Sequence, residues 1–544
     1  MSDHKKPWEQ SLGQFLEDVV ARNPDKTFIE IGGQSKSYLE FYDGARKAAA
    51  MFADLGICKE DRVCLFLPNC IEYVYSWFGL SLIGAISVPV NTAYKRDEMA
   101  YILNNAEAKG LVTDPSLIDV AGAAAELAPS VNVKLLRGLT GTIPDGWVDY
   151  SRAHDEVEPL GSLPNVSPDD VSMLVYTSGT TGNPKGVMCT HLMYVAAGQG
   201  FAHWTEATPE DRFFTCLPYY HANIQYYSTM GALASGGTLV VVDRFSASRF
   251  WGQVREARAT VVNFIGMMMP VLAKNERSFD DRDNSVRLFY GSPSFPPEFL
   301  ADFQERFATD IIVGFGMTET CFGTIELIGE PRRAGSSGGP RQHPDEGFEN
   351  QVRIADQVTG EHLGAGVVGE ITIRNPAIMP GYWRNDEQNA ETLKDGWLYT
   401  GDLGWVDSDG FLYFVDRKKD IIRRRGENIS SQEVENVVKR HPNVLDCAVL
   451  AVPSELGEDE VKAYVTPREG ATPDPRELVY WCADNLAYFK VPRYWEVRDE
   501  LPRTPSLRVR KDVLRQEKED LIEGCFDMES AGIKLRRSLK SCEE

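Results

Sequence analysis

The sequence lacks the cysteine and histidine patterns that mark metal sites and disulfide frameworks. Its 10 cysteines include no Cys-X-X-Cys pair, and its 8 histidines form no cluster near them. Structural zinc sites and small disulfide scaffolds both depend on such spacings. The pattern therefore argues against both classes and indicates reduced thiols in a cytoplasmic protein.

Positive charge is also scarce. The chain has 57 Lys and Arg against 80 Asp and Glu, which gives a formal net charge of −23 at pH 7. A surface of this sign repels nucleic-acid backbones and anionic membranes. We therefore expect no nucleic-acid partner, and any polyphosphate site must gather cations and amide donors locally.

Long apolar segments are few. The residues from Met1 to Phe15 lack the apolar core of a signal peptide, so we expect none. The segment Tyr73 to Val90 carries no charge, but glycines, serines and Pro89 interrupt it. We interpret it as a buried helix followed by a buried strand and expect no membrane span.

What the chain does have is alternating helical and strand patterns over 544 residues, enough for several structural units. Amphipathic helical patterns occupy Ser11–Asn23 and Tyr38–Leu55, and short β-rich runs such as RVCLFLP and ATVVNFI recur. The predicted fold class is α/β, with a large N-terminal domain of layered sheets and helices over residues 1–416. A charged run from Asp416 to Asp420 marks the boundary to a small α+β domain, residues 417–519, and residues 520–544 are predicted to be a tail.

The strongest motif is Tyr176 to Gly186, which reads YTSGTTGNPKG and follows an apolar strand pattern. Its glycines allow tight bends that aim backbone amides at a ligand, and its hydroxyls add donors. Lys185 adds a point charge suited to phosphate. Because Gly186 follows Lys185, the loop is not a Walker A motif. By composition alone, an ordinary Ser/Thr/Gly turn stays an alternative.

The loop resembles the signature of the adenylate-forming superfamily, which includes acyl-CoA synthetases, peptide-synthetase adenylation domains and beetle-type luciferases. The resemblance extends over about Trp8 to Leu514. It implies a large N-terminal domain, a small mobile C-terminal domain, and the use of ATP, Mg²⁺ and coenzyme A with a carboxylic acid.

Matching the superfamily motifs to this sequence implies a nucleotide site. Glu319 is expected to hold Mg²⁺, since carboxylates are hard ligands, and Lys185, Thr318 and Glu319 are expected to be catalytic. Phe315 is expected to stack on adenine, where the family more often has tyrosine. The implied ATP and AMP contacts are Thr177, Ser178, Gly179, Thr180, Thr181, Gly182, Gly291, Ser292, Pro293, Gly314, Phe315, Gly316, Met317, Thr318, Asp402 and Arg417.

The resemblance also implies an acyl pocket and a domain hinge. The implied acyl-pocket residues are His221, Asn223, Phe264 and Gly266. Lys419 matches the hinge, and Gly426 matches the glycine that lets the thiol arm of coenzyme A pass close to backbone. A histidine beside aromatics, or a methionine-rich stretch like FIGMMM, is usually core packing, so the pocket assignments depend on the resemblance.

One motif departs from the family. The last motif of the superfamily usually ends in a lysine that reaches the substrate carboxylate and the α-phosphate of ATP. In this sequence Arg508 stands at that position, within PRTPSLRVRK. Arginine keeps the charge in a planar, bulkier side chain. Lys511 remains an alternative, so both are candidate catalytic residues.

The resemblance therefore implies an AMP-forming acid–thiol ligase, an acyl-CoA synthetase whose segments resemble carnitine/crotonobetaine-type ligases. Two alternatives stay open. One is an acyl-AMP transferase that delivers to a carrier-protein thiol or an amine, and the other is a nucleotide-binding pseudoenzyme, because of Arg508. The acid itself is not identified, and a homodimer is left open.

Overall fold

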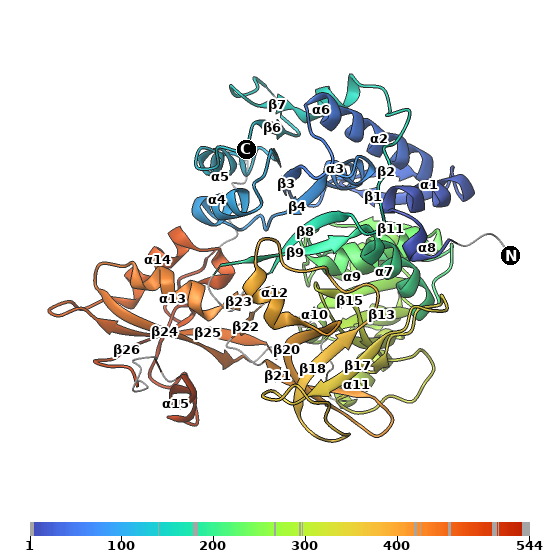
Figure 1. Cartoon of the computed structure of the whole chain (residues 1–544). Helices are drawn as coiled ribbons and strands as arrows, with labels where there is room; N and C mark the ends of the chain where they lie inside the picture. Colours follow the sequence, from blue (N-terminus) through green and yellow to red (C-terminus); the bar gives the residue numbers. More distant parts are fainter. Residues whose placement is uncertain are drawn as a thin grey trace. The chain divides into compact units, whose positions relative to one another are not determined.

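The computed structural model describes residues 5–139, 141–177, 183–265, 268–292, 295, 297–417, 421–424, 426–454, 458–502, 509 and 511–535. The chain divides into two compact units. Unit 1 consists of Met1–Thr92, Leu103–Tyr176 and Gly186–Lys418, and unit 2 of Ala93–Ile102, Thr177–Lys185 and Lys419–Glu544. Figure 1 labels the elements in chain order, from blue to red, and the orange and red segments contain most of unit 2.

The largest sheet has nine strands in the order β16-β15-β14-β13-β12-β10-β11-β1-β2. Its strands are β1 (Thr27–Ile31), β2 (Gln34–Ser37), β10 (Arg212–Thr215), β11 (Thr238–Val241), β12 (Val261–Ile265), β13 (Leu288–Ser292), β14 (Asp310–Met317), β15 (Thr320–Ile325) and β16 (Gly339–Pro340). Neighbours from β1 and β11 through to β14 are parallel. The carboxyl ends of β12, β13 and β14 therefore meet at one edge, where α/β sheets bind ligands.

Two further sheets complete the strand layers. The seven-stranded sheet runs β7-β6-β5-β3-β4-β8-β9, and a five-stranded sheet contains β17-β18-β20-β19 with β21 beside β20. Their strands are β3 (Arg62–Phe66), β4 (Ile86–Pro89), β5 (Gly110–Thr113), β6 (Val133–Leu136), β7 (Val148–Asp149), β8 (Val171–Thr177), β9 (Lys185–Thr190), β17 (Gln351–Ala355), β18 (Gly369–Arg374), β19 (Leu393–Lys394), β20 (Trp397–Val406) and β21 (Leu412–Arg417). A turn closed by the Gly410 amide, which donates to the Asp407 carbonyl at 3.1 Å, joins β20 to β21, which are antiparallel.

Helices alternate with these strands along the chain. They are α1 (Leu12–Arg22), α2 (Tyr38–Asp54), α3 (Ile71–Leu82), α4 (Arg96–Asn105), α5 (Ile118–Ala125), α6 (Tyr150–Asp155), α7 (His191–Trp204), α8 (Met230–Ser235), α9 (Phe250–Ala257), α10 (Met268–Ala273), α11 (Pro297–Phe307) and α12 (Asp386–Thr392), with short turns η1 (Pro7–Glu9) and η3 (Phe279–Arg282) and a π-helix, η2 (Ile224–Thr229). The predicted start of α1 is confirmed, because the Ser11 hydroxyl accepts a hydrogen bond from the Gln14 amide at 3.4 Å.

The uncharged segment Tyr73–Val90 forms most of α3 and all of β4, as the sequence predicts. All but one of the α3 residues are buried, many of them in the main hydrophobic core of unit 1, and every residue of β4 is buried too. Among the helices that the structure describes, none is both long and apolar enough to cross a bilayer. Burial inside the protein thus accounts for the apolar run.

Unit 2 contains a second hydrophobic core, separate from that of unit 1. Its elements are β22 (Ile421–Arg424), β23 (Glu427–Ser430), α13 (Ser431–Lys439), β24 (Val444–Pro453), β25 (Asp459–Pro467), α14 (Pro475–Asn485), η4 (Tyr488–Lys490), β26 (Tyr494–Val497), α15 (Lys511–Gln516) and β27 (Phe526–Asp527). The apolar stripe of α13, formed by Val434, Val437 and Val438, is buried in this core. The α+β character predicted for this part of the chain is therefore confirmed.

The segment 520–544, predicted to be a tail, contains β27. This strand pairs antiparallel with β26 through Trp495 and Phe526, and Met528 and Ile533 are buried in the core of unit 2. Arg493 holds the segment by donating from Nε to Asp527 at 3.0 Å. The described part of the segment therefore packs against unit 2.

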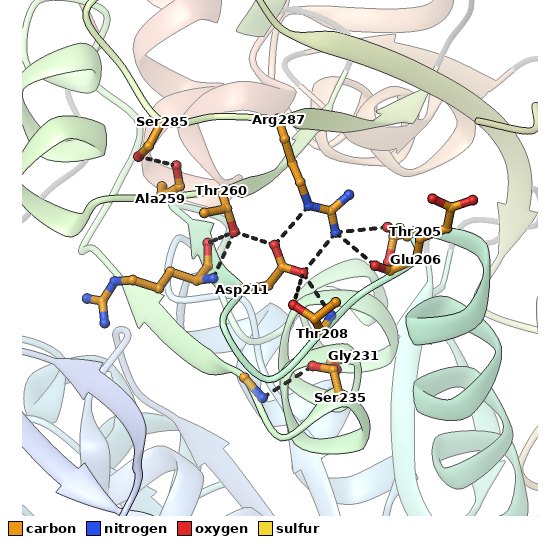
Figure 2. Close-up of polar contacts among 12 residues, drawn as sticks. Thr205, Glu206, Thr208, Asp211, Gly231, Ser235, Ala259, Thr260, Ser285 and Arg287 are labelled. Carbon is orange, nitrogen blue, oxygen red and sulfur yellow. Dashed lines mark hydrogen bonds and ion pairs between the residues drawn. The ribbon is translucent and has the colours of Figure 1, made fainter. Parts of the chain in front are cut away.

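At the amino end of the parallel strands, the ion pair of Asp211 with Arg287 and a hydrogen bond from Thr260 connect the segments that enter β10, β13 and β12 (Figure 2). The Asp211 carboxylate accepts from Arg287 at 2.9 Å, from the Thr260 hydroxyl at 2.7 Å and from the Thr208 amide at 2.8 Å. Burial alone would raise the pKa of Asp211, but these hydrogen bonds outweigh burial and hold that pKa below its ordinary value. The cluster stabilises the edge of the sheet opposite to the expected ligand edge.

Replacing Asp211 by asparagine is expected to lower the stability of unit 1 by about 2 kcal/mol. The effect stays below that of a fully buried pair because the Arg287 side chain is 36% exposed. Since the folded pKa of Asp211 is depressed, its contribution is complete above the unfolded pKa and is lost as pH falls through the folded pKa. Denaturant titrations of both proteins at pH 7 and pH 3 measure the free energy of unfolding and how far the difference between them shrinks at low pH.

The matched control for this prediction is Glu156→Gln. Glu156 pairs with Arg152 at 2.8 Å, but both side chains are well exposed. Such a pair is worth about 0.5 kcal/mol or less. If Asp211→Asn shifts the unfolding midpoint no more than Glu156→Gln does, the cluster does not stabilise the sheet edge.

Candidate functional site

Three parallel strand ends bring together residues that the sequence assigns to nucleotide and acyl binding. Gly291 at the end of β13 pairs in register with Phe264 of β12 and with Val313 of β14. A Cβ atom on Gly291 would lie 2.1 Å from the Phe264 carbonyl oxygen, so the close approach requires glycine. Gly291, Phe264 and Gly314 are therefore neighbours, whereas Pro293 lies outside the described residues.

The predicted motif Gly314–Thr320 forms the end of β14, a tight turn and the start of β15. Phe315 pairs with Thr324 and Met317 with Thr320, with an irregularity between the two pairs. Phe315 is 9% exposed, and the centre of its ring lies 6.4 Å from that of Phe414, with 30° between the ring planes. The turn places Thr318 and Glu319 side by side at the tip of this hairpin.

Glu319 is held in place from a distant part of the sequence. It is 6% exposed, and its Oε1 accepts a hydrogen bond from the Tyr382 hydroxyl at 2.7 Å. Its backbone oxygen accepts from the Met379 amide at 2.9 Å. Burial, and then the charge of Glu319, raises the pKa of Tyr382, so this phenol stays a neutral donor. Sequence reasoning missed Tyr382 because it lies far from Glu319 along the chain.

The surroundings of Glu319 fit magnesium. Among the described residues, no group of three or more His, Cys, Asp or Glu side chains could hold a metal ion alone. Mg²⁺ commonly uses one or two carboxylates together with substrate phosphates and waters. A single buried carboxylate at the tip of the hairpin, with one oxygen fixed by Tyr382, is the donor set expected for such a shared metal.

Two tyrosines of the π-helix η2 form hydrogen bonds with the backbone of the β14–β15 hairpin. The Tyr226 hydroxyl donates to the Thr318 carbonyl at 3.1 Å, and the Tyr227 hydroxyl donates to the Cys321 carbonyl at 3.0 Å. π-helical turns are uncommon and occur frequently at functional sites. Because η2 directly follows His221 and Asn223, it connects the predicted acyl pocket to the predicted nucleotide hairpin.

The structure describes three of the four predicted acyl-pocket residues, and hydrogen bonds connect the region of two of them, Asn223 and Phe264. The Asn263 amide donates to the Asn223 side chain at 3.1 Å and to the Ser228 hydroxyl at 2.7 Å. Phe264 is fully buried, and His221 is half-buried beside the Tyr220 ring. Gly266 lies outside the described residues. Asn263, which the sequence reasoning missed, thus joins the polar part of this region.

The two residues predicted to contact ribose are neighbours. Asp402 of β20 pairs in register with Arg417 of β21, so their backbones lie across from one another in the sheet. Asp402 is 9% exposed, and its amide donates to the Thr400 hydroxyl at 3.1 Å. Adjacent residues of opposite charge at the end of a hairpin could together bind a ribose and a phosphate.

The phosphate loop is described only at its two ends. Thr177 ends β8 and Lys185 begins β9, whereas Ser178, Gly179, Thr180, Thr181 and Gly182 lie outside the described residues. The strand β9 is anchored just after Lys185, because the Trp383 amide donates to the Gly186 carbonyl at 2.7 Å. The anchor lies next to Tyr382, the partner of Glu319.

The candidates of unit 2 differ in what the structure describes. Gly426 lies in the turn between β22 and β23 with φ of +77°, and its amide donates to Glu458 at 3.3 Å. Lys511 donates to the Ser431 hydroxyl at 2.6 Å and pairs with Glu435 at 2.7 Å. Lys419 and Arg508 lie outside the described residues.

Comparison with known sequences adds a family. A sequence model described as AMP-binding enzyme matches residues 16–383, and one described as AMP-binding enzyme C-terminal domain matches residues 433–508. The chain is 36% identical over 514 residues to a crotonobetaine/carnitine–CoA ligase of Escherichia coli, a match that covers 92% of this chain and 98% of that one.

Two solved structures are similar over nearly the whole chain. An o-succinylbenzoate CoA synthetase from Bacillus subtilis, bound to a product analogue, has a TM-score of 0.80 at 25% identity and covers 94% of this chain and 99% of its own. An amide bond synthetase from Marinactinospora thermotolerans has a TM-score of 0.81 at 27% identity, with 93% and 99% covered.

Proposed function

The chain belongs to the AMP-binding enzyme family and is an adenylate-forming acyl-CoA ligase, and from this premise we propose which residues serve each half-reaction and which acid is activated. In the first half-reaction a carboxylate oxygen of the acid attacks the α-phosphorus of ATP. The bond to the β-phosphate oxygen breaks, giving acyl-AMP and pyrophosphate. The thiolate of coenzyme A then attacks the acyl carbon, and AMP leaves.

The first half-reaction requires positive charge where negative charge develops. Lys185 and the amides and hydroxyls of Thr177 to Gly182 bind the phosphates, and Thr318 donates to the α-phosphate. Glu319 would hold Mg²⁺, which supplies charge neutralisation on the triphosphate when bound. What supports this assignment is the buried Glu319 carboxylate, fixed by Tyr382 at the tip of the β14–β15 hairpin.

The adenosine part is assigned to the neighbouring strand ends. Phe315 stacks on the adenine, the backbone from Gly291 to Pro293 contacts its edge, and Asp402 with Arg417 binds the ribose. The register of β13 with β14 and of β20 with β21 supports this grouping. For the second half-reaction, residues 417–519 act as the mobile domain, turning about Lys419, with Gly426 along the path of the thiol arm.

The acid is proposed to be a short carboxylic acid bearing a quaternary ammonium group, as the name of the Escherichia coli relative indicates for that enzyme. The observation behind this proposal is 36% identity over 98% of that relative. The polar contacts between Asn223 and Asn263 suit a small polar acyl group better than a long alkyl chain. Magnesium dependence, cytoplasmic location and a homodimer stay predictions.

An amine acceptor is the second candidate, because one similar solved structure is an amide bond synthetase with a TM-score of 0.81. A panel of acids tests both proposals. The purified protein, ATP and Mg²⁺ are combined with carnitine, crotonobetaine, butyrate, octanoate or benzoate, and with coenzyme A or a primary amine. Acyl-CoA, amide and AMP are then quantified by chromatography.

We expect AMP and acyl-CoA in equal amounts, with kcat/KM for a betaine acid at least about tenfold above butyrate, since one fully bound polar group contributes roughly that factor. A higher value for octanoate or benzoate would replace the proposed acid. Amide formation without thioester would replace the proposed acceptor. If none of the acids in the panel supports AMP release, the pseudoenzyme alternative is favoured.

A further inference from the structure

A buried arginine lies behind the hairpin that is proposed to bind the nucleotide. Arg341 follows β16 and is 1% exposed. No carboxylate among the described residues forms an ion pair with it. Arginine stays protonated in proteins, so unit 1 contains a permanent buried positive charge that no described carboxylate neutralises by direct contact. Such a charge is costly to bury.

Hydrogen bonds to neutral groups offset part of that cost. Nε donates to the Thr324 carbonyl at 2.8 Å, and Nη1 donates to the Cys321 carbonyl at 3.0 Å. Nη1 also donates to the Tyr227 hydroxyl at 2.7 Å, and Nη2 donates to the Tyr290 hydroxyl at 2.5 Å. The planar guanidinium thus uses its fixed donor directions on acceptors from three different elements.

Aromatic rings surround the same group. The guanidinium carbon lies 5.2 Å from the Trp204 ring centre, 5.3 Å from that of Tyr227 and 5.6 Å from that of Tyr290. Rings at this distance attract a cation through their negative faces. Burial raises the pKa of both tyrosines, so each remains a neutral phenol that can accept from the arginine.

The guanidinium is also in close contact with β14, the strand that carries Phe315. A Cβ atom on Gly314 would lie 2.5 Å from Arg341 Nη2, and one on Gly316 would lie 3.3 Å from Nη1. A side chain at position 314 would therefore displace the guanidinium, and one at position 316 would press tightly against it. The backbone on either side of Phe315, the proposed adenine-stacking residue, lies directly on this group.

These contacts converge on the proposed nucleotide site. Tyr290 directly precedes Gly291 on β13, Gly314 and Gly316 flank Phe315 on β14, and Cys321 lies near Glu319 at the start of β15. One side chain therefore contacts β13 and β14, whose ends carry part of the proposed nucleotide contacts, and β15, which begins directly after Glu319. A residue that served only to fill space would not need a charge at this position, because an apolar side chain of similar volume is cheaper to bury.

We propose that Arg341 is a positioning residue for the nucleotide, whose hydrogen bonds fix the relative placement of the ends of β13, β14 and β15. The proposal rests on the proposed function, because the nucleotide contacts are assigned there. Binding sites need their contacts held closely, and a small displacement of the backbone weakens every contact at once. Arg341 acts through the backbone and does not itself contact ATP.

The test compares Arg341→Met, which removes charge and hydrogen bonds, with Arg341→Lys, which keeps the charge but loses the fork. We expect the KM for ATP to rise about tenfold in Arg341→Met and several-fold in Arg341→Lys, with the KM for coenzyme A unchanged. Calorimetry should show AMP and uncharged adenosine weakened by the same factor, because positioning affects the whole nucleotide.

Arg287→Met is the matched control. Arg287 directly precedes β13, at the opposite end of that strand from Gly291, and its loss should lower the melting temperature without changing the KM for ATP. If Arg341→Met is too unstable to purify, Tyr227→Phe with Tyr290→Phe removes two acceptors of the guanidinium. We expect this double variant to raise the KM for ATP also.

Two results would overturn the inference. Folded Arg341 variants with the wild-type KM for ATP would show that the arginine only packs, and loss confined to AMP would show a charge effect without positioning. Glu319→Gln, assayed in parallel, separates this from failure of the proposed function. If Glu319→Gln is impaired while the Arg341 variants are normal, only the role of Arg341 is wrong. If neither change affects adenylation, the nucleotide assignments are wrong too.

Discussion

Glutamine at position 319 is expected to slow acyl-AMP formation at least about 100-fold, the scale of losing one preorganised charged contact. The substitution keeps the size of the side chain, and an amide oxygen can still accept from the Tyr382 hydroxyl, which lies 2.7 Å from Oε1. Only the charge that would hold Mg²⁺ is lost. ATP–pyrophosphate exchange measures the step, and circular dichroism confirms the fold.

Tyr382→Phe is the companion variant for Glu319. It leaves the carboxylate in place and removes only the donor that fixes Oε1. A loss of about tenfold is expected, the worth of one hydrogen bond to a charged group. Lys185→Ala should resemble Glu319→Gln, since both act on the triphosphate. Wild-type exchange by Glu319→Gln would contradict the assignment of the metal-binding carboxylate.

Alanine at position 508 is expected to slow adenylation about 100-fold and to leave thioester formation from added acyl-AMP nearly unchanged. The carboxylate and the α-phosphate repel each other as they approach, and a cation between them offsets that repulsion. The arginine fork could bridge the two anions. Single-turnover kinetics of each half-reaction measure the difference.

Lys511 is a poor candidate for the same task, because its ammonium group already has partners in unit 2. It donates to the Ser431 hydroxyl at 2.6 Å and pairs with Glu435, whose side chain is 6% exposed. Lys511→Ala should therefore lower the free energy of unfolding of unit 2 and leave the adenylation rate nearly unchanged. Normal adenylation by Arg508→Ala together with slow adenylation by Lys511→Ala would transfer the catalytic role to Lys511.

Local patterns predicted the elements of this fold well. The helical pattern at Ser11–Asn23, the β-rich run RVCLFLP and the helix–strand succession from Tyr73 to Val90 each depend on residues close together in the chain. The family resemblance supplied the candidates on β13, β14 and β20 in the same way, because motifs are contiguous. Register then paired β13 with β14 and, in a separate sheet, β20 with β21.

What the sequence could not predict are contacts between distant residues. Tyr382 reaches Glu319 across 63 positions, and Arg341 reaches Tyr227 across 114. Each of these side chains, taken alone, is an ordinary aromatic or surface charge by composition. Its role follows only from the packing of unit 1, where a hydroxyl or a guanidinium meets a group that no local pattern connects to it.

The short strand β27 has a practical consequence for anyone who shortens this protein. The match to the C-terminal family region ends at residue 508, and a chain cut there would lack β27 together with Met528 and Ile533. The edge of β26 would then present bare amide and carbonyl groups beside a gap in the apolar core. Exposed strand edges of this kind recruit strands from other molecules, so the shortened chain would be prone to aggregation at high concentration.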